Sequence, residues 1–210
     1  MKQPRTQEEL EQLVRSTLGH YEGRVEAFWQ GTRDHDVSQN IETLLRYLPK
    51  DRPLQILDFG CGPGRDLLDW KSRGHLPIGL DGSLGFCEKA RALAGVEVWH
   101  QDFLALDLPD GLFDGVFANA SLFHVPSQEM PRVLRELCAT LQDDGVLFAS
   151  NPRGGDVEGY NDQRYGTYLC LETWQQLVTE AGFVELEHYY RPAGRPRDEQ
   201  PWLASAWRKV

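Results

Sequence analysis

The feature that most constrains the fold is a short apolar run that ends in an aspartate and a glycine-rich turn. The run Leu54-Gln-Ile-Leu57 is followed by Asp58 and then by Phe-Gly-Cys-Gly-Pro-Gly at 59–64. The run predicts a buried parallel strand, and the glycines let the backbone turn tightly and approach a ligand. A second expected strand, 77–81, ends at Asp81, whose carboxylate suits a ribose diol. Together these elements predict a doubly wound sheet that binds an adenosine-containing cofactor.

The glycine spacing separates this turn from that of dinucleotide-binding proteins. Those proteins use G-x-G-x-x-G, which aims a helix N-terminus at a pyrophosphate. Here the spacing is G-x-G-x-G, and Pro63 removes one amide donor. Asp58 would repel a pyrophosphate, whereas it suits an ammonium or a sulfonium-bearing amino acid held through water. The pattern resembles motif I of the class I S-adenosylmethionine-dependent methyltransferases. A turn that only connects a strand to a helix is the alternative interpretation.

Apolar periodicity predicts an α/β fold in which strands and helices alternate. We expect a doubly wound, mostly parallel seven-stranded sheet with an antiparallel C-terminal strand. Residues 1–210 would form one domain, with an N-terminal helical lid at 1–50 and a cofactor-binding core at 51–210. The expected strands span 54–58, 77–81, 96–100, 113–118, 145–150, 183–190 and 201–208. The expected helices span 6–18, 38–48, 65–73, 83–94, 127–141 and 171–181, and the first begins with a Thr6–Glu9 capping box. Residues 151–168 are expected to form a loop.

Composition excludes several classes of function. The 210 residues suit one domain with a full-sized core, and the net charge of −10 argues against nucleic acid and anionic membrane surfaces as partners. No apolar run approaches the ~20 residues that a membrane span needs, and the N-terminus has no apolar signal core. The four cysteines lie far apart and the six histidines show no ligand spacing. We therefore expect a cytoplasmic protein without a metal.

The residues at the carboxyl ends of the strands are the candidates for cofactor binding, because ligands of such sheets bind there. Asp102 and Phe103 follow the third strand and match the adenine contact of the resembled methyltransferases. A loop-capping aspartate is the alternative. The candidate cofactor-binding residues are Asp58, Gly60, Cys61, Gly62, Arg65, Asp81, Gly82, Ser83, Asp102, Phe103 and Asn119.

Two candidate catalytic residues, Asn119 and His124, follow the fourth strand. Their segment resembles motif IV of the methyltransferases, which implies a position beside the transferred methyl group. A histidine with an ordinary pKa titrates near neutral pH, so His124 is expected to accept a proton from the acceptor or to orient it. A loop histidine bonded to the backbone is the alternative.

Two polar and aromatic segments, 28–40 and 151–168, are the candidates for acceptor binding. Guanidinium groups bind a carboxylate with two hydrogen bonds, and tyrosines stack on a small ring. A solvated helix connection would also explain the charges in the first segment. The candidate substrate-binding residues are Arg33, His35, Asp36, Gln39, Asn151, Arg153, Arg164, Tyr165 and Tyr168.

A closer resemblance comes from the runs GTRDHDVSQNI, ILDFGCGPGRDL, FDGVFANASLFHVPSQE and EHYYRPAGRPR, followed by QPWLASAWRK. They are similar to the methyltransferase domain of the ovothiol-biosynthesis enzymes. The resemblance implies that S-adenosylmethionine is the cofactor and that the substrate is a small-molecule amino acid, 5-thiohistidine, methylated on an imidazole nitrogen. In those enzymes the domain follows sulfoxide synthase domains that this sequence does not include, so the resemblance implies either a free-standing enzyme that works with a separate sulfoxide synthase or a domain excised from a larger enzyme. The alternatives are another small acceptor, such as a seleno analogue, a thiol or a carboxylate, and a non-catalytic cofactor-binding subunit.

Overall fold

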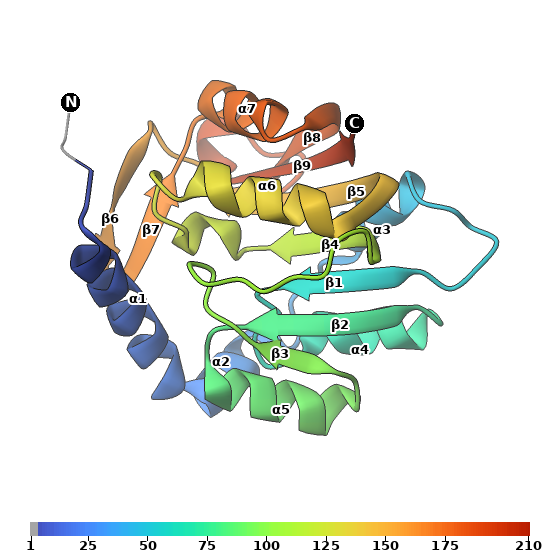
Figure 1. Cartoon of the computed structure of the whole chain (residues 1–210), viewed down its shortest axis with the longest axis horizontal. Coiled ribbons are helices and arrows are strands. Elements are labelled where there is room, and N and C mark those ends of the chain that lie inside the picture. The colour runs from blue at the N-terminus through green and yellow to red at the C-terminus, as the bar shows by residue number, and fades with distance from the viewer. Residues whose placement is uncertain (1–3) are drawn as a thin grey trace.

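The computed structural model describes residues 4–210, in which a seven-stranded sheet has helices on both faces (Figure 1). The strand order is β3-β2-β1-β4-β5-β9-β8. Neighbouring strands from β3 to β5 are parallel, and β9 is antiparallel to both β5 and β8. The strands are β1 Gln55–Phe59, β2 Leu76–Asp81, β3 Val98–His100, β4 Phe113–Asn119, β5 Leu141–Pro152, β8 Phe183–Arg191 and β9 Trp202–Lys209. The expected fold class is confirmed.

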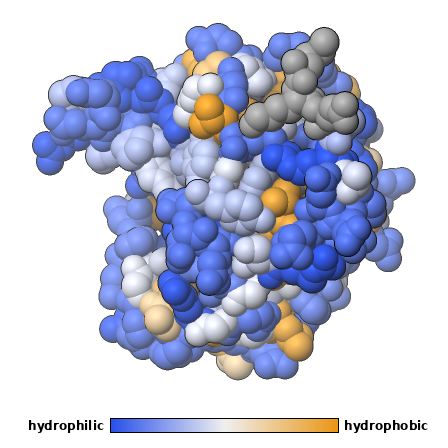
Figure 2. All heavy atoms as spheres, turned by 90° about the vertical axis from the view of Figure 1, so that its left-hand side faces the viewer, coloured by the Kyte–Doolittle hydropathy of each residue, from blue (hydrophilic) through white to orange (hydrophobic). Residues whose placement is uncertain are grey.

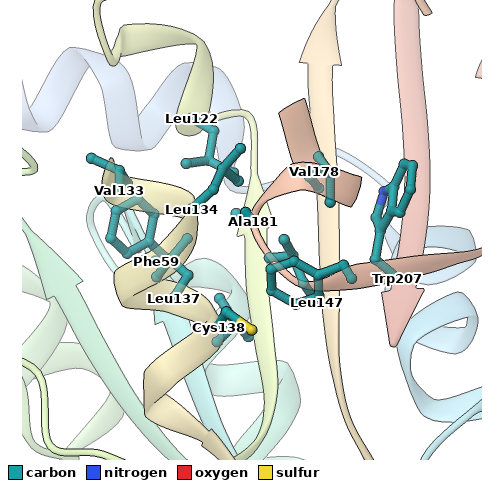
Figure 3. Close-up of a cluster of buried hydrophobic side chains, with 14 of the residues drawn as sticks. Phe59, Leu122, Val133, Leu134, Leu137, Cys138, Leu147, Val178, Ala181 and Trp207 are labelled. Carbon is teal, nitrogen blue, oxygen red and sulfur yellow. The ribbon is translucent and has the colours of Figure 1, made fainter. Parts of the chain in front are cut away.

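The sheet is buried on both faces, which explains its nearly continuous apolar strands. Leu57 and Phe59 join a core cluster with residues of the helices 130–140 and 171–180 (Figure 3), and Leu54 and Ile56 join a second cluster with residues of the helix 38–46 and with Trp70. The helices are α1 Gln7–Glu22, α2 Val25–Thr32, α3 Ser38–Arg46, α4 Arg65–Ser72, α5 Leu84–Ala94, α6 Met130–Thr140 and α7 Leu171–Glu180, with short 3-10 turns η1 Leu122–His124 and η2 Arg197–Glu199.

Helix α1 crosses the carboxyl ends of the strands, on the side to which the arrowheads of β1, β2 and β4 point in Figure 1. The expected capping box at its start is present, because Thr6 and Glu9 each accept from the other's backbone N–H. The helix runs to Glu22, further than its apolar stripe predicted. Leu18 packs so closely on Gly82 that a Cβ there would lie 2.8 Å from it. The helix is therefore fitted to the strand ends that it covers.

The expectation of a loop over residues 151–168 was wrong in part, because a hairpin forms there. Strands β6 Val157–Asn161 and β7 Arg164–Tyr168 pair in antiparallel register as a separate sheet. The segment lacks a clear alternation of apolar residues, and the hairpin is held by α1 instead. Tyr165 is buried against Leu10 and Leu13, and its backbone N–H donates to Thr17 Oγ1. Tertiary packing thus decides a structure that strand propensity did not reveal.

The face formed by α1 and the hairpin is mainly hydrophilic, with apolar side chains scattered over it (Figure 2). Between residues 4 and 210, no helix combines the length and the apolar character that crossing a bilayer requires. Cytoplasmic location stays a prediction.

Asp114 ties the start of β1 to β4, and its loss should destabilise the fold. Its buried carboxylate accepts from Arg52 and from the Gln55 amide. Burial by itself would raise the pKa of Asp114, but these hydrogen bonds outweigh it and lower the pKa. We expect Asp114→Ala to cost about 1–3 kcal/mol of unfolding free energy in denaturant titrations.

A carboxyl whose pKa is lowered by folding stabilises the protein above its unfolded pKa, about 3.9, and loses that effect as the pH falls through the folded value. The difference between wild type and Asp114→Ala should therefore shrink below about pH 4. The exposed Asp110→Ala is the control. An equal difference at acid and neutral pH would contradict the role assigned to the carboxylate.

Candidate functional site

A cavity of about 620 Å³ lies at the carboxyl ends of the strands, under α1 and α2. It is lined by the glycine turn after β1, by the ends of β2 and β4, and by the segment after β3. The lid segment 35–37, Arg164 of the hairpin, and the C-terminal residues Arg191, Pro192 and Trp202 complete its wall. The polar strand ends that stand far apart in the sequence therefore meet in one space.

The turn after β1 requires glycine for two reasons. Gly60, Gly62 and Gly64 have φ of +77°, +52° and +97°, which side chains disfavour. A Cβ on Gly60 would also lie 2.3 Å from Cβ of Ser121, so no side chain fits at the end of β4. This leaves a cradle of backbone along the cavity, and its shape suits the close approach of a ligand.

Asp81 connects this turn to β2 and presents its carboxylate to the cavity. Its two oxygens accept from the Gly62 and Ser83 amides, each at 2.9 Å, and each keeps a further lone pair. Burial raises the pKa of Asp81 to about 6. Ser83 does not line the cavity, because it is buried as the N-cap of α5, where its hydroxyl accepts from Phe86. Gly82 lines it beneath α1.

The segment after β3 forms the opposite wall. Asp102 Oδ1 accepts from the Leu104 amide at 2.8 Å, and burial raises the pKa of Asp102. The Phe103 ring stacks on Phe59, with 4.2 Å between the ring centroids. Both Asp102 and Phe103 line the cavity, and their contact with adenine stays a prediction.

Asp58 does not line the cavity, unlike the other acidic residues of the strand ends. It is buried behind the turn, and its Oδ2 has no hydrogen-bond partner among residues 4–210. Burial raises its pKa well above the usual range, with Asp66 acting in the same direction. Arg65 does line the cavity, where its guanidinium binds both Asp66 oxygens and the carbonyl of Thr32.

Asn119 at the end of β4 is held by a polar network. Its Oδ1 accepts from Asn40 Nδ2 at 2.9 Å, and its Nδ2 donates to Asp66 at 3.2 Å. Asn40 is fixed in turn by the Tyr189 hydroxyl. The network joins α3, α4, β4 and β8, elements that are distant in sequence, so the bond between Asn40 and Asn119 could not be predicted from either segment alone.

His124 lies on the cavity wall, but the expectation that it titrates near neutral pH was wrong. Burial lowers its pKa to about 4. Nδ1 lies 2.7 Å from the Tyr165 carbonyl oxygen, and Nε2 lies 2.8 Å from the Tyr21 hydroxyl oxygen. The imidazole is therefore neutral and has partners on both nitrogens. Tyr21 lines the cavity and was not among the candidates from sequence.

The candidate substrate residues divide into two groups. His35, Asp36 and Arg164 line the cavity. The other candidates do not line it. Arg33 pairs with Asp34, Gln39 is exposed on α3, and Asn151 lines a small separate pocket. Arg153 donates to the carbonyls of Arg197 and Gln200, Tyr165 is buried under α1, and Tyr168 pairs with Val157 in the hairpin.

Two cavity residues that the sequence reasoning missed come from the C-terminal strands. Arg191 donates to the Asp36 carbonyl at 3.0 Å and lines the cavity with Trp202. Both lie within or beside runs that carry the resemblance to the ovothiol enzymes. That similarity was a signal for these residues.

The central region of the chain matches a known protein family. Residues 56–145 match the family model described as a methyltransferase domain. Trans-aconitate 2-methyltransferase of Azoarcus sp. is 35% identical over 124 residues, which cover 58% of this chain and 48% of that protein. Malonyl-[acyl-carrier protein] O-methyltransferase of Erwinia pyrifoliae is 31% identical over 142 residues, which cover 67% and 49%. The chain spans about half the length of these two curated relatives.

A solved structure matches the whole chain. The 1,6-didemethyltoxoflavin-N1-methyltransferase of Burkholderia thailandensis, with S-adenosylhomocysteine bound, has a TM-score of 0.77 at 21% identity, and the match covers 100% of this chain and 93% of that one. The fold and the cavity at its strand ends are thus those of an α/β methyltransferase. With the match of residues 56–145 to the methyltransferase-domain model, the comparisons support an S-adenosylmethionine-dependent methyltransferase, with S-adenosylmethionine as cofactor.

Turnover should not depend on a metal. Among residues 4–210, no group of three or more His, Cys, Asp or Glu side chains could hold an ion. Methyl transfer from a sulfonium mainly needs alignment and exclusion of water. We expect activity to survive excess chelator. Loss of turnover that one divalent ion restores would contradict this.

Asp81 should control cofactor affinity in a pH-dependent way. Its charged form accepts most strongly from ribose hydroxyls, so affinity for S-adenosylhomocysteine should fall as the pH drops through about 6. Asp81→Asn should lower the affinity about ten-fold or more at neutral pH and abolish this pH dependence. Calorimetry from about pH 5 to 8 measures both effects, with the exposed Asp110→Asn as control. Equal affinity of wild type and Asp81→Asn would remove Asp81 from the site.

Proposed function

We propose that the chain is an N-methyltransferase that methylates an imidazole nitrogen of 5-thiohistidine. The observation that carries the proposal is Arg164, a guanidinium in the cavity wall whose buried Nε has no hydrogen-bond partner among residues 4–210. The rest of the side chain hydrogen-bonds to the Tyr21 hydroxyl. The nearby carboxylate of Asp162 approaches His20 and Arg24 instead. A guanidinium without a carboxylate partner suits the carboxylate of an amino-acid acceptor.

Other groups in the wall fit the remaining parts of such an acceptor. The Asp36 carboxylate accepts from the Ser38 amide, and hydrogen bonding from Ser38 lowers its pKa, so it stays charged and suits an ammonium. Phe123 and Trp202, with ring centroids 6.5 Å apart, offer aromatic surfaces to a flat ring. Together with the sequence runs shared with the ovothiol enzymes, these groups support a zwitterionic acceptor with a small heterocycle.

The residues of the chain would act mainly by binding and positioning. S-adenosylmethionine, when bound, supplies a methyl group activated by the sulfonium. The turn at 60–62, with Asp81, Asp102 and Phe103, would hold the nucleoside, while the network through Asn119 stiffens the wall between cofactor and acceptor. Helix α1 covers the strand ends and excludes water. A separate sulfoxide synthase would supply the sulfur-bearing acceptor.

A second candidate is methylation of a small carboxylic acid. It is favoured by the 35% identity to trans-aconitate 2-methyltransferase, since Arg164 would hold a carboxylate equally well. A seleno analogue of thiohistidine and other thiols are further acceptors that the same cavity volume admits. Assays of purified protein with 5-thiohistidine, histidine and trans-aconitate distinguish these substrates by product mass and NMR. Equal rates on all three would contradict a dedicated acceptor, and exclusive S-methylation would refute the nitrogen assignment.

Arg164→Gln should impair acceptor binding selectively. Loss of a charge-assisted pair of ~1.5–3 kcal/mol predicts a KM for 5-thiohistidine about ten-fold higher or more. The affinity for S-adenosylhomocysteine, measured by calorimetry, should change only a few-fold. Arg15→Gln, on the exposed face of α1, is the matched control. An unchanged KM in Arg164→Gln would remove this arginine from acceptor binding.

A further inference from the structure

His124 lies between two oxygen atoms, and one of them fixes which ring nitrogen carries the proton. Nδ1 lies 2.7 Å from the Tyr165 carbonyl oxygen, and Nε2 lies 2.8 Å from the Tyr21 hydroxyl oxygen. A carbonyl oxygen only accepts, so Nδ1 carries the proton of the neutral ring. Nε2 is then an acceptor, and the hydroxyl of Tyr21 donates its only proton to His124.

The hydroxyl oxygen of Tyr21 therefore has no proton to give a ligand. Arg164 also hydrogen-bonds to this hydroxyl, and because a guanidinium only donates, one of the two lone pairs of the oxygen remains for a ligand in the cavity. Tyr21 and His124 both line the cavity. The Tyr21 ring packs against Phe28 and Phe86, each with 5.5 Å between centroids, so packing fixes its orientation. A ligand group that meets this oxygen favourably must be a hydrogen-bond donor.

We infer that Tyr21 Oη accepts a hydrogen bond from the N–H of the acceptor's imidazole ring and so selects its tautomer, an inference that rests on the proposed function. A neutral imidazole has one N–H and one nitrogen with a lone pair. Because Tyr21 holds the N–H, the lone pair is on the other nitrogen, which is the nucleophile. Tyr21 is the residue that touches the acceptor, and His124 is a positioning residue that acts through it.

This hydrogen bond strengthens during the reaction. The nucleophilic nitrogen forms a bond to the methyl carbon, the carbon–sulfur bond breaks with its electron pair going to sulfur, and positive charge passes to the imidazole ring. The ring N–H becomes more acidic as this charge develops, so its bond to Tyr21 stabilises the transition state more than the ground state. The proton stays on the ring nitrogen, and the step needs no general base.

The surroundings of His124 keep the proton of Tyr21 pointing in one direction. Burial lowers the pKa of His124 to about 4, and Arg164 and His20 act in the same direction against the Tyr165 carbonyl. His124 is thus neutral at physiological pH and remains an acceptor. An imidazolium there would donate to Tyr21 and turn the hydroxyl proton toward the acceptor.

The test is the identity of the methylated isomer formed from 5-thiohistidine. Wild type should give a single ring-nitrogen isomer, whereas Tyr21→Phe should give a mixture of two, with kcat lower by ~10-fold or more. His124→Phe frees the Tyr21 proton and should give the same mixture, and His124→Gln, which keeps an acceptor, should restore the single isomer.

Calorimetry with S-adenosylhomocysteine should show nearly unchanged affinity in all of them. Tyr160→Phe, an exposed tyrosine of β6, is the matched control.

A second readout does not depend on turnover. Nitrogen-15 NMR of His124 in the free protein should show Nδ1 protonated and Nε2 unprotonated from about pH 6 to 8. Protonation at Nε2, or the wild-type isomer and rate in Tyr21→Phe, would overturn the inference and leave the proposed function intact. Failure of wild type to methylate 5-thiohistidine at all would overturn the proposed function, and this inference with it.

Discussion

The site depends on the close approach of the turn after β1 to the ends of the two neighbouring strands. The amides of Gly60 and Cys61 donate to the Leu80 carbonyl of β2, and Ser121 Oγ donates to the Phe59 carbonyl. No side chain fits at Gly60, because its Cβ would overlap Ser121. These contacts lock the ends of β1, β2 and β4 together. The cavity-lining groups at the ends of these three strands are therefore held at fixed positions relative to one another.

Burial gives the ionisable groups of this cavity unusual properties. Asp81 keeps two backbone donors, yet burial still raises its pKa to about 6. Asp58, which is buried behind the turn, has no hydrogen-bond partner for its Oδ2 in the described chain, and burial raises its pKa well above the usual range. Burial acts on a histidine in the opposite sense and keeps His124 neutral. At neutral pH Asp81 is therefore still mostly charged, whereas His124 is neutral and acts through hydrogen bonds instead of proton transfer.

Helix α1 and the β6–β7 hairpin together form the part of the cavity wall where we propose that the acceptor binds. Helix α1 brings Tyr21, and β7 brings Arg164 and the Tyr165 carbonyl, while His124 of η1 bonds to both elements. The side chain of Tyr165 anchors the hairpin under α1 through Leu10 and Leu13. A shift of α1 would therefore disturb the hydrogen bonds of His124 and the position of Arg164 together. If the acceptor binds as proposed, its recognition depends on the packing of α1.

The sequence alone determined the fold class, the expected cofactor, and most of the cofactor wall. Those features have local causes, because the glycine turn, Asp81 and Asp102 each follow an apolar strand, and parallel strands bring their carboxyl ends to one edge. The tertiary structure decided the acceptor side. Tyr21, Asn40, Arg191 and Trp202 come from elements distant in sequence, while Arg153 and Tyr165, which the composition of their segment favoured, are held elsewhere by the C-terminal connection and by α1. The protonation of His124 was also beyond the sequence, since a pKa depends on the burial and the partners that only packing provides.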